Sequence, residues 1–415
     1  MTILPKRLRI GIVTTSFPKV DGDIPGSFVY EMARALVRRG HQLEIVTPEP
    51  KENTTWNDIP PARWMDSMRV KSVPYVRPRS LQTLFYGSGV PDNLATNPLR
   101  SLLIPPAMLN LYIGIRLSAR HWDALISHWL LPSALLSGWA RKPHTRHLAI
   151  AHSADIHLLQ SIPGGKLLAR KIIQVTDHIG FVSNMLKKEF ISLFDARSAA
   201  SLVPRVSITP MGIDSHGLVD TTPRDMLRRK LDIEGFTVLF LGRLVSIKGV
   251  DVLLQALMGI EGFMVIIAGD GPERRALEKI ANACQINVRF TGPVDAKGRA
   301  QLLKACDAMA VPSRILINGR HEGVPLVIPE ALSAGLPVVA TNTGGIGEII
   351  THNENGLLVP PDNSSALRRA LLALKKDKAL SRRLSKAGKE KMKYREWSNL
   401  ITGYESILFP CNHWD

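Results

Sequence analysis

Two glutamates eight positions apart, Glu322 and Glu330, are the side chains of this sequence best suited to chemistry on a ligand. An ionised carboxylate accepts paired hydrogen bonds from vicinal hydroxyl groups, which are the groups that a ribose or a sugar presents. The alternative is that Glu322 caps a helix and Glu330 forms a structural ion pair. We interpret the pair as part of a site for a sugar or a nucleoside.

The residues between and after the glutamates predict sites for an anion. Pro325 suits a first helical turn, where its missing N–H would have no partner, and Gly335 ends the helix predicted over residues 326–334. Unpaired N–H groups and the helix dipole at such a start suit a pyrophosphate. The N–H groups expected to face it belong to Val324, Leu326 and Val327. The Gly344–Gly345 pair, before another helix start, predicts a second nest of N–H groups.

The elements that must position these residues alternate between apolar strands and amphipathic helices. In the first half, strands are predicted over residues 9–15, 43–47, 124–127, 147–151, 178–182 and 206–209, with a helix over 27–39. In the second half, strands are predicted over 237–242, 264–268, 288–291, 308–311 and 338–341. The helices between them are predicted over 250–257, 273–283 and 300–305. Short strand–helix–strand connections imply right-handed crossovers and parallel sheets.

This pattern predicts an α/β protein with two doubly wound, Rossmann-like domains. We place the first domain at residues 1–210, the second at 211–385, and a C-terminal segment at 386–415 whose helix, over 397–408, packs back across the domains. Ligands of such sheets bind at the carboxyl ends of the strands. A cleft between two facing domains is therefore the expected site.

Residues 50–120 are harder to assign. They are rich in Pro and Arg, and an apolar, helix-like stretch over 99–116 is interrupted by Pro105 and Pro106. With Arg100, Arg116 and Arg120 nearby, this stretch is either a core helix or an amphipathic segment that contacts a membrane face.

Composition narrows the class of protein. The net charge of +17 lies mainly in residues 1–215, where 26 Lys and Arg stand against 15 Asp and Glu. Such a surface suits anionic substrates or lipids, or simply solubility, and no nucleic-acid-binding motif is present. No stretch reaches about 18 uninterrupted apolar residues, and no signal peptide is apparent. Three cysteines without a C-x-x-C pair fit a reducing cytoplasm and predict no metal site.

The second half resembles the retaining GT-B glycosyltransferases of glycosyltransferase family 4, whose E-x7-E motif matches Glu322 to Glu330. The similarity covers roughly residues 205–375. Its further segments are GRLVSIKGVD at 242–251, AGDGPE at 268–273, FTGPV at 290–294 and NGLLVPP at 355–361. The resemblance implies the GT-B fold, with two Rossmann-like domains facing across a cleft, and sugar transfer from a nucleotide sugar.

The resemblance also implies roles for particular residues. Arg243 and Lys248 would bind the donor diphosphate and stabilise the leaving group, which requires positive charge but no metal. Glu330 would bind the ribose, Glu322 the transferred sugar, and Val294 the base through its backbone. Further donor contacts are implied for Gly26, Gly323, Val324, Leu326, Val327, Gly345 and Ile346, the last two through their N–H groups.

The first half carries a thinner resemblance. AHSAD at 151–155 matches a strand-end H-x-x-D element, which would place His152 against the transferred sugar with Asp155 orienting its neighbours. His128 is placed on the acceptor side by the resemblance, although its residue type and position favour a structural role. Pro25-Gly26-Ser27 stands where the family has a Gly-Gly pair, so one of the two glycines is replaced.

One loop departs from the family pattern. Residues 314–321, RILINGRH, are longer and more basic than usual and resemble a subgroup that builds exopolysaccharide or colanic-acid-like repeat units. Arg314, Arg320 and His321 are candidates to reach a donor or acceptor phosphate.

We therefore expect a retaining hexosyltransferase of polysaccharide biosynthesis. Its partners would be a UDP- or GDP-sugar, an oligosaccharide or polyprenyl-linked acceptor and an anionic membrane surface, with no cofactor, no metal and no nucleic acid. We expect a cytoplasmic enzyme, peripheral on the inner membrane face. The alternatives are a non-catalytic protein of the same fold that binds sugar nucleotides or a membrane surface, and a GT-B epimerase. A Rossmann oxidoreductase is disfavoured because no G-x-G-x-x-G follows the first strand.

Overall fold

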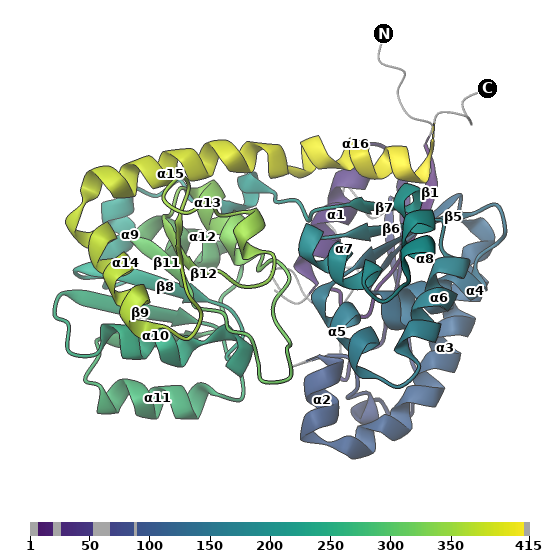
Figure 1. Cartoon of the computed structure of the whole chain (residues 1–415), viewed down its shortest axis with the longest axis horizontal. Helices are drawn as coiled ribbons and strands as arrows, with labels where there is room; N and C mark the ends of the chain where they lie inside the picture. Colours follow the sequence, from purple (N-terminus) through teal and green to yellow (C-terminus); the bar gives the residue numbers. More distant parts are fainter. Residues whose placement is uncertain (1–6, 20–25, 53–66, 87–88, 411–415) are drawn as a thin grey trace, which may run out of the picture. The chain divides into compact units, whose positions relative to one another are not determined.

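The computed structural model describes residues 7–19, 26–52, 67–86 and 89–410 and divides the chain into two compact units. The first unit comprises residues 1–212 together with 397–415, and the second comprises 213–396 (Figure 1). The division thus falls at 212/213 and 396/397. Pro25 and Cys411, the last of the three cysteines mentioned above, lie outside the described residues.

The first unit is built on a seven-stranded parallel sheet in the order β3-β2-β1-β4-β5-β6-β7. Its strands are β1 (Arg9–Val13), β2 (Gln42–Pro48), β3 (Met68–Val73), β4 (Ala124–His128), β5 (Arg146–Ala151), β6 (His178–Phe181) and β7 (Val206–Ile208). Its helices are α1 (Ser27–Arg38), α2 (Val90–Thr96), α3 (Ile104–Ser118), α4 (Leu135–Ala140), α5 (Ser153–Ser161), α6 (Gly165–Val175), α7 (Asn184–Ile191), α8 (Ala196–Leu202) and α16 (Trp397–Leu408). The strand order reverses beside β1, which is the pattern of a doubly wound sheet.

Helix α16 is the part of the first unit most distant in sequence. It packs against α1 and β5, and its Glu405 accepts hydrogen bonds from Arg39 and lies 2.9 Å from Nε2 of the buried His41. Tyr404 donates to the carbonyl oxygen of Pro210 at 3.0 Å. These buried contacts attach the C-terminal helix to the first unit.

The second unit contains a six-stranded parallel sheet in the order β10-β9-β8-β11-β12-β13. Its strands are β8 (Phe236–Leu241), β9 (Phe263–Ala268), β10 (Val288–Gly292), β11 (Ala308–Val311), β12 (Val338–Thr341) and β13 (Leu357–Val359). Its helices are α9 (Arg224–Lys230), α10 (Val250–Leu257), α11 (Arg274–Ala283), α12 (Ala296–Ala305), α13 (Val327–Ala334), α14 (Ser364–Lys376) and α15 (Lys378–Met392).

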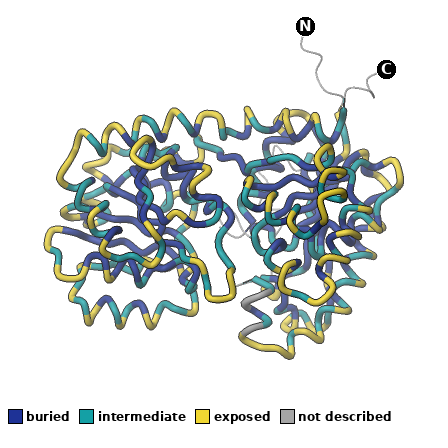
Figure 2. The backbone as a smooth tube through the Cα atoms, viewed as in Figure 1, coloured by how far each residue is buried: buried dark blue, intermediate teal, exposed yellow. Residues whose placement is uncertain are grey.

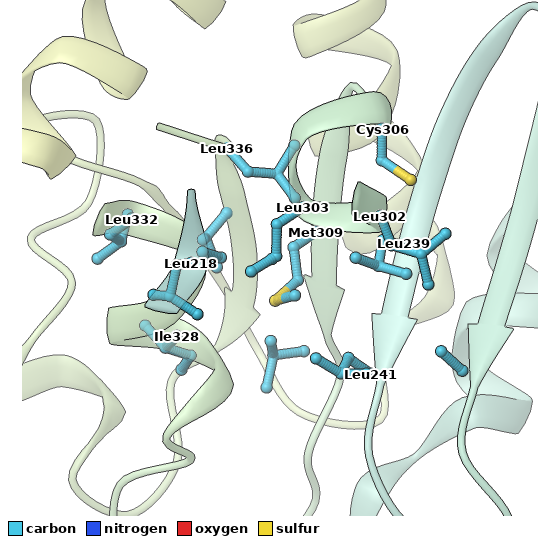
Figure 3. Close-up of a cluster of buried hydrophobic side chains, with 14 of the residues drawn as sticks. Leu218, Leu239, Leu241, Leu302, Leu303, Cys306, Met309, Ile328, Leu332 and Leu336 are labelled. Carbon is cyan, nitrogen blue, oxygen red and sulfur yellow. The ribbon is translucent and has the colours of Figure 1, made fainter. Parts of the chain in front are cut away.

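Each face of the second sheet is covered by its own helices. Side chains from α9, α12 and α13 form one buried cluster with the sheet, part of which is drawn in Figure 3, and side chains from α10, α11 and α14 form the other. In Figure 2 the strands β8, β9, β11 and β12 are accordingly buried almost throughout, whereas the edge strand β10 is only partly buried. The structure therefore confirms the predicted α/β class with two Rossmann-like sheets.

The sequence predicts that Pro105 and Pro106 interrupt a helix over 99–116. In the structure they do not interrupt one. A 3-10 segment over Pro98–Leu103 precedes them, and α3 begins at Ile104 with prolines in its first turn. Proline is well accommodated there because its missing N–H has no intrahelical partner.

Candidate functional site

Glu322 lies in the second unit, in the loop between β11 and α13, and both of its carboxylate oxygens have partners. Lys248 forms an ion pair with Oε1, and the hydroxyl of the buried Ser313 donates to Oε2 at 2.5 Å. Lys248 and Glu322 expose only 16% and 14% of their side chains. A carboxylate and an ammonium group are thus brought together at the carboxyl ends of the strands, where ligands of such sheets bind.

The backbone at Glu322 packs against the glycine pair that follows β12. Gly344 has φ +55°, and a Cβ atom there would lie 1.8 Å from the carbonyl oxygen of Glu322. The N–H of Gly345 donates to the carbonyl oxygen of Gly323 at 2.7 Å. Only glycine at position 344 allows this approach, so the pair determines where Glu322 and Gly323 lie.

The same geometry corrects one expectation. The resemblance implies that the N–H groups of Gly345 and Ile346 contact the transferred sugar. The first donates to Gly323 as described, and the second donates to the carbonyl oxygen of Thr343 at 3.1 Å. Both N–H groups are therefore engaged within the chain in this conformation.

Helix α13 begins one residue later than predicted. Its first residue is Val327, Leu326 occupies the N-cap position, and Pro329 lies in the first turn. The N–H of Ile328 already bonds to the carbonyl oxygen of Pro325. The N–H groups of Leu326 and Val327 stand at the helix start, where the backbone has no preceding turn to bond with.

Glu330 is buried on α13 and pairs with a residue that sequence reasoning missed. Arg299, on α12, donates from Nη1 to Glu330 Oε1 at 2.8 Å, and each side chain exposes 11% of its surface. Burial raises the pKa of Glu330, while the charge of Arg299 opposes this increase. Among the described residues, no hydrogen-bond partner lies within reach of the buried Arg299 Nε.

Arg243 and Val294 occupy strand ends of the second unit. Arg243 is exposed and follows β8 by two residues, and Val294 follows β10 and packs partly against the buried cluster of Figure 3. These positions, like those of Lys248, Glu322 and the start of α13, lie in loops at the carboxyl ends of the strands.

The loop over 314–321 corrects a second expectation. Arg314 donates from Nη2 to both carboxylate oxygens of Asp251 at 3.0 and 2.8 Å, and its Nε lies 2.9 Å from Asp362. Its guanidinium therefore holds the base of the loop and is not directed at a ligand phosphate. His321 donates from Nδ1 to the carbonyl oxygen of Glu322 at 2.9 Å.

A compact aromatic group in the first unit contains the other predicted site residues. The rings of His128 and His152 are stacked with centroids 5.5 Å apart, and His128 Nδ1 lies 3.2 Å from His152 Nε2. Phe28 and Trp129 pack against both rings. Trp129 has φ +70°, a strained conformation for a bulky residue and one that is concentrated at functional sites.

Asp155 orients this group. Its carboxylate accepts from the N–H of His152 at 2.9 Å and of Leu130 at 3.0 Å, while the His152 ring accepts from the Asp155 N–H. Burial lowers the pKa of His152 to about 3 and that of His128 well below its usual value, and burial raises the pKa of Asp155 to about 8. Both imidazoles are therefore neutral at pH 7 and suited to hydrogen bonding.

Gly26 stands at the N-cap of α1 with φ +77°, and a Cβ atom there would lie 2.5 Å from the carbonyl oxygen of Ser16. The position therefore requires glycine, and it brings the start of α1 close to the loop after β1.

Both halves of the chain are similar to known glycosyltransferases. Residues 26–216 match the family model described as Glycosyltransferase Family 4, and residues 223–391 match the model for Glycosyl transferases group 1. A GDP-mannose-dependent alpha-(1-6)-phosphatidylinositol monomannoside mannosyltransferase of Mycobacterium tuberculosis is 29% identical, with 92% of this chain and 93% of that protein covered. A D-inositol 3-phosphate glycosyltransferase of Xylanimonas cellulosilytica is 27% identical, with coverage of 88% and 86%.

Solved structures agree on the fold. Sucrose-phosphate synthase from Thermosynechococcus elongatus superposes with a TM-score of 0.74 at 19% identity, covering 97% of this chain and 98% of that one. Anabaena HepE in complex with UDP superposes with a TM-score of 0.72 at 18% identity, covering 97% and 99%.

The two Rossmann-like sheets, the family models matched by both halves of the chain and the relatives together indicate a GT-B glycosyltransferase that uses a nucleotide-sugar donor. Within that class the chain is a family 4-like glycosyltransferase, and the predicted transferase activity is confirmed.

Proposed function

We propose that this enzyme transfers mannose from GDP-mannose to a lipid-linked acceptor, with retention of configuration at the anomeric carbon. The observation that carries the proposal is the pairing of Glu322 with Lys248 and of Glu330 with Arg299, on adjoining loops and helices of one unit. The names of the relatives support the donor and the acceptor class, since mannosyltransferases similar over most or two thirds of this chain use GDP-mannose and act on phosphatidylinositol mannosides.

In this proposal the donor occupies the second unit. Glu330 accepts hydrogen bonds from the ribose hydroxyls, and Glu322 accepts them from the mannose. Lys248 has three N–H donors, so it can keep its contact with Glu322 while it binds a diphosphate oxygen. Arg243, exposed at the end of β8, adds a second positive charge. These charges stabilise the diphosphate as the glycosyl bond breaks.

The proposed reaction takes place on one face of the sugar. The acceptor hydroxyl forms its bond to the anomeric carbon as the bond from that carbon to the diphosphate breaks, and the hydroxyl proton passes to a phosphate oxygen of the leaving group. In the first unit, His152, neutral and held by Asp155 and His128, is the group that we propose for hydrogen bonding to a sugar hydroxyl. We propose that no metal takes part.

Binding and transfer assays test the proposal separately. GDP-mannose at about 100 times its dissociation constant stabilises the protein by roughly 2.7 kcal/mol, a thermal shift that Glu330→Ala should abolish. Transfer is then assayed with a phosphatidylinositol mannoside, in the presence and absence of EDTA, and NMR of the product reports the anomeric configuration. A shift with UDP-sugars alone would overturn the donor assignment, and an inverted product would overturn the mechanism.

A polysaccharide precursor is the second candidate acceptor. The basic loop over 314–321, which resembles that of exopolysaccharide enzymes, favours it. A polyprenyl-diphosphate-linked oligosaccharide in the same transfer assay distinguishes the two acceptors. Either acceptor would place the enzyme in the cytoplasm, at the inner face of the membrane.

A further inference from the structure

Helix α3 exposes a continuous apolar stripe. Leu109, Ile113 and Leu117 follow one another at intervals of four residues, so they lie on one face of the helix. Their exposed fractions are 60%, 45% and 50%. In the 3-10 segment just before α3, Leu99 and Leu102 are each 73% exposed, which extends the apolar surface.

The opposite face of α3 attaches the helix to its sheet. Leu111 and Ile115 are buried in a cluster with residues of β1 to β4, and Lys71 of β3 donates to the carbonyl oxygen of Gly114 and to Ser118. The helical stretch Pro98–His121 is long and apolar enough to cross a membrane, yet a third of its most apolar window is buried in the protein. Because one face is packed and the other exposed, this helix suits contact with a membrane surface.

The charge around the stripe is almost entirely positive. Residues 98–175 contain nine Lys and Arg but only two acidic residues, Asp123 and Asp155. Asp155 is buried, and Asp123 accepts a hydrogen bond from the N–H of Arg9. Arg116 and Arg120 are exposed beside Leu117 at the end of the helix. An anionic partner would therefore meet little repulsion here.

The helices next to α3 also expose apolar and basic side chains. Helix α4 packs against both α3 and α6, and the three helices are labelled close together at the right of Figure 1. Trp139 on α4 is 52% exposed and Leu167 on α6 is 65% exposed. Lys166 and Lys171 are also exposed on α6. We call the exposed side chains of α3, α4 and α6 the basic apolar surface.

We infer that the basic apolar surface binds the headgroup region of an anionic phospholipid bilayer. The leucine and isoleucine side chains of α3 would enter the boundary between headgroups and acyl chains, and the lysines and arginines would bind lipid phosphates. Trp139 suits such a boundary because its ring is apolar and its N–H polar. The inference rests on the proposed function in one respect: a lipid-linked acceptor lies in a membrane, and binding to that membrane would bring the enzyme to it.

Vesicle binding by the full-length protein tests the inference. Binding to vesicles of phosphatidylcholine with 30% phosphatidylglycerol should exceed binding to phosphatidylcholine alone, and should weaken between 50 and 300 mM NaCl. The triple variant Leu109→Gln, Ile113→Gln, Leu117→Gln should bind the anionic vesicles at least tenfold more weakly. The control variant Met226→Gln, Met258→Gln changes exposed apolar residues of the second unit and should bind as the parent protein does.

Two further measurements separate the possible outcomes. The thermal shift with GDP-mannose should be equal in the parent protein and both variants, which shows that they are folded and that loss of vesicle binding is independent of the donor site. Undiminished vesicle binding by the triple variant would overturn the inference, as would absence of binding by the parent protein at 50 mM NaCl. Light scattering that shows a parent dimer and a monomeric triple variant would instead assign this surface to a second copy of the chain.

Discussion

Arg299 and Glu330 form an ion pair between two neighbouring helices, with 2.8 Å between Nη1 and Oε1 and with both side chains largely buried. A carboxyl group buried without a positive neighbour favours its neutral form. The charge of Arg299 opposes the increase in the pKa of Glu330 that burial causes. It therefore favours the ionised form, which can accept two hydrogen bonds from a ribose.

The first prediction concerns this pair. Arg299→Met should weaken donor-nucleotide binding at pH 7 by about tenfold, or 1.4 kcal/mol, because the pKa of Glu330 rises further and the ionised carboxylate becomes less favoured. Since a higher pH favours the ionised carboxylate, binding by the variant should recover as the pH is raised above 7. Isothermal titration across this range measures the effect. Arg228→Met, which removes an ion pair to Asp307 elsewhere in the second unit, is the control. A loss that does not vary with pH would show that Arg299 has only a structural role.

Lys248 gives a second prediction, on catalysis. Lys248→Met should lower kcat by about 100- to 1,000-fold, the usual effect of removing one group that stabilises developing negative charge. Because Lys248 and Glu322 are paired, the double variant with Glu322→Gln should lose less than the sum of the two single losses in free energy. Steady-state kinetics of the four proteins measures the coupling. Lys304→Met, whose ammonium donates to the carbonyl oxygen of Asp220, should retain the parent kcat. Fully additive losses would argue against a shared role.

For Arg314 we predict an effect on stability and not on donor binding. Since its guanidinium binds Asp251 and Asp362, Arg314→Met should lower the free energy of unfolding by about 2 kcal/mol, and donor affinity should change by less than twofold. Urea unfolding and titration with GDP-mannose measure the two quantities. A loss of donor affinity with an unchanged free energy of unfolding would show that Arg314 binds the donor.

Much of this architecture is predictable from sequence, because apolar runs bounded by glycine mark buried strands and helix ends. Helix α10, helix α16 and strands β11 and β12 have the predicted bounds. Strand β3 was missed because Met68–Val73 lies at the sheet edge and alternates with Arg69 and Lys71. An edge strand of this kind lacks the continuous apolar run of a buried parallel strand.

The candidate site was predictable only in part. The glutamates could be found because their spacing and the helix start between them are local in sequence. The partners of Arg314 could not, since Asp251 and Asp362 lie far along the chain. Arg299 was missed because α12 begins at Ala296, four residues before the predicted start, with Asp295 as its N-cap. The glycine pair at 344–345 resembled a nest, but the carbonyl oxygen of Gly323 occupies it.

His147 provides a prediction on stability and pH. It is buried against Ser127, and burial lowers its pKa to about 3. Its unfolded form, with a pKa near 6.5, binds a proton that the folded form does not, so stability falls as the pH decreases from 6.5 toward 3. His147→Gln should reduce the slope of unfolding free energy against pH by about 1.4 kcal/mol per pH unit near pH 5. Urea unfolding at pH 4.5 to 6.5 measures it. Ser127→Ala, which keeps the imidazole, should leave the slope unchanged; an equal reduction in both variants would contradict the prediction.

Helix α16 completes the first unit with residues from the far end of the chain, and this has a consequence for biosynthesis. During translation the second unit has its whole sequence available once residue 396 has emerged. The first unit, begun earlier, still lacks Tyr404 and Glu405 at that moment. Domains ordinarily fold as they emerge, the N-terminal one first. Here the first unit, which is synthesised first, is the last to be completed. A premature stop codon just before Trp397 would therefore destabilise the first unit, although the mutation lies at the 3′ end of the gene.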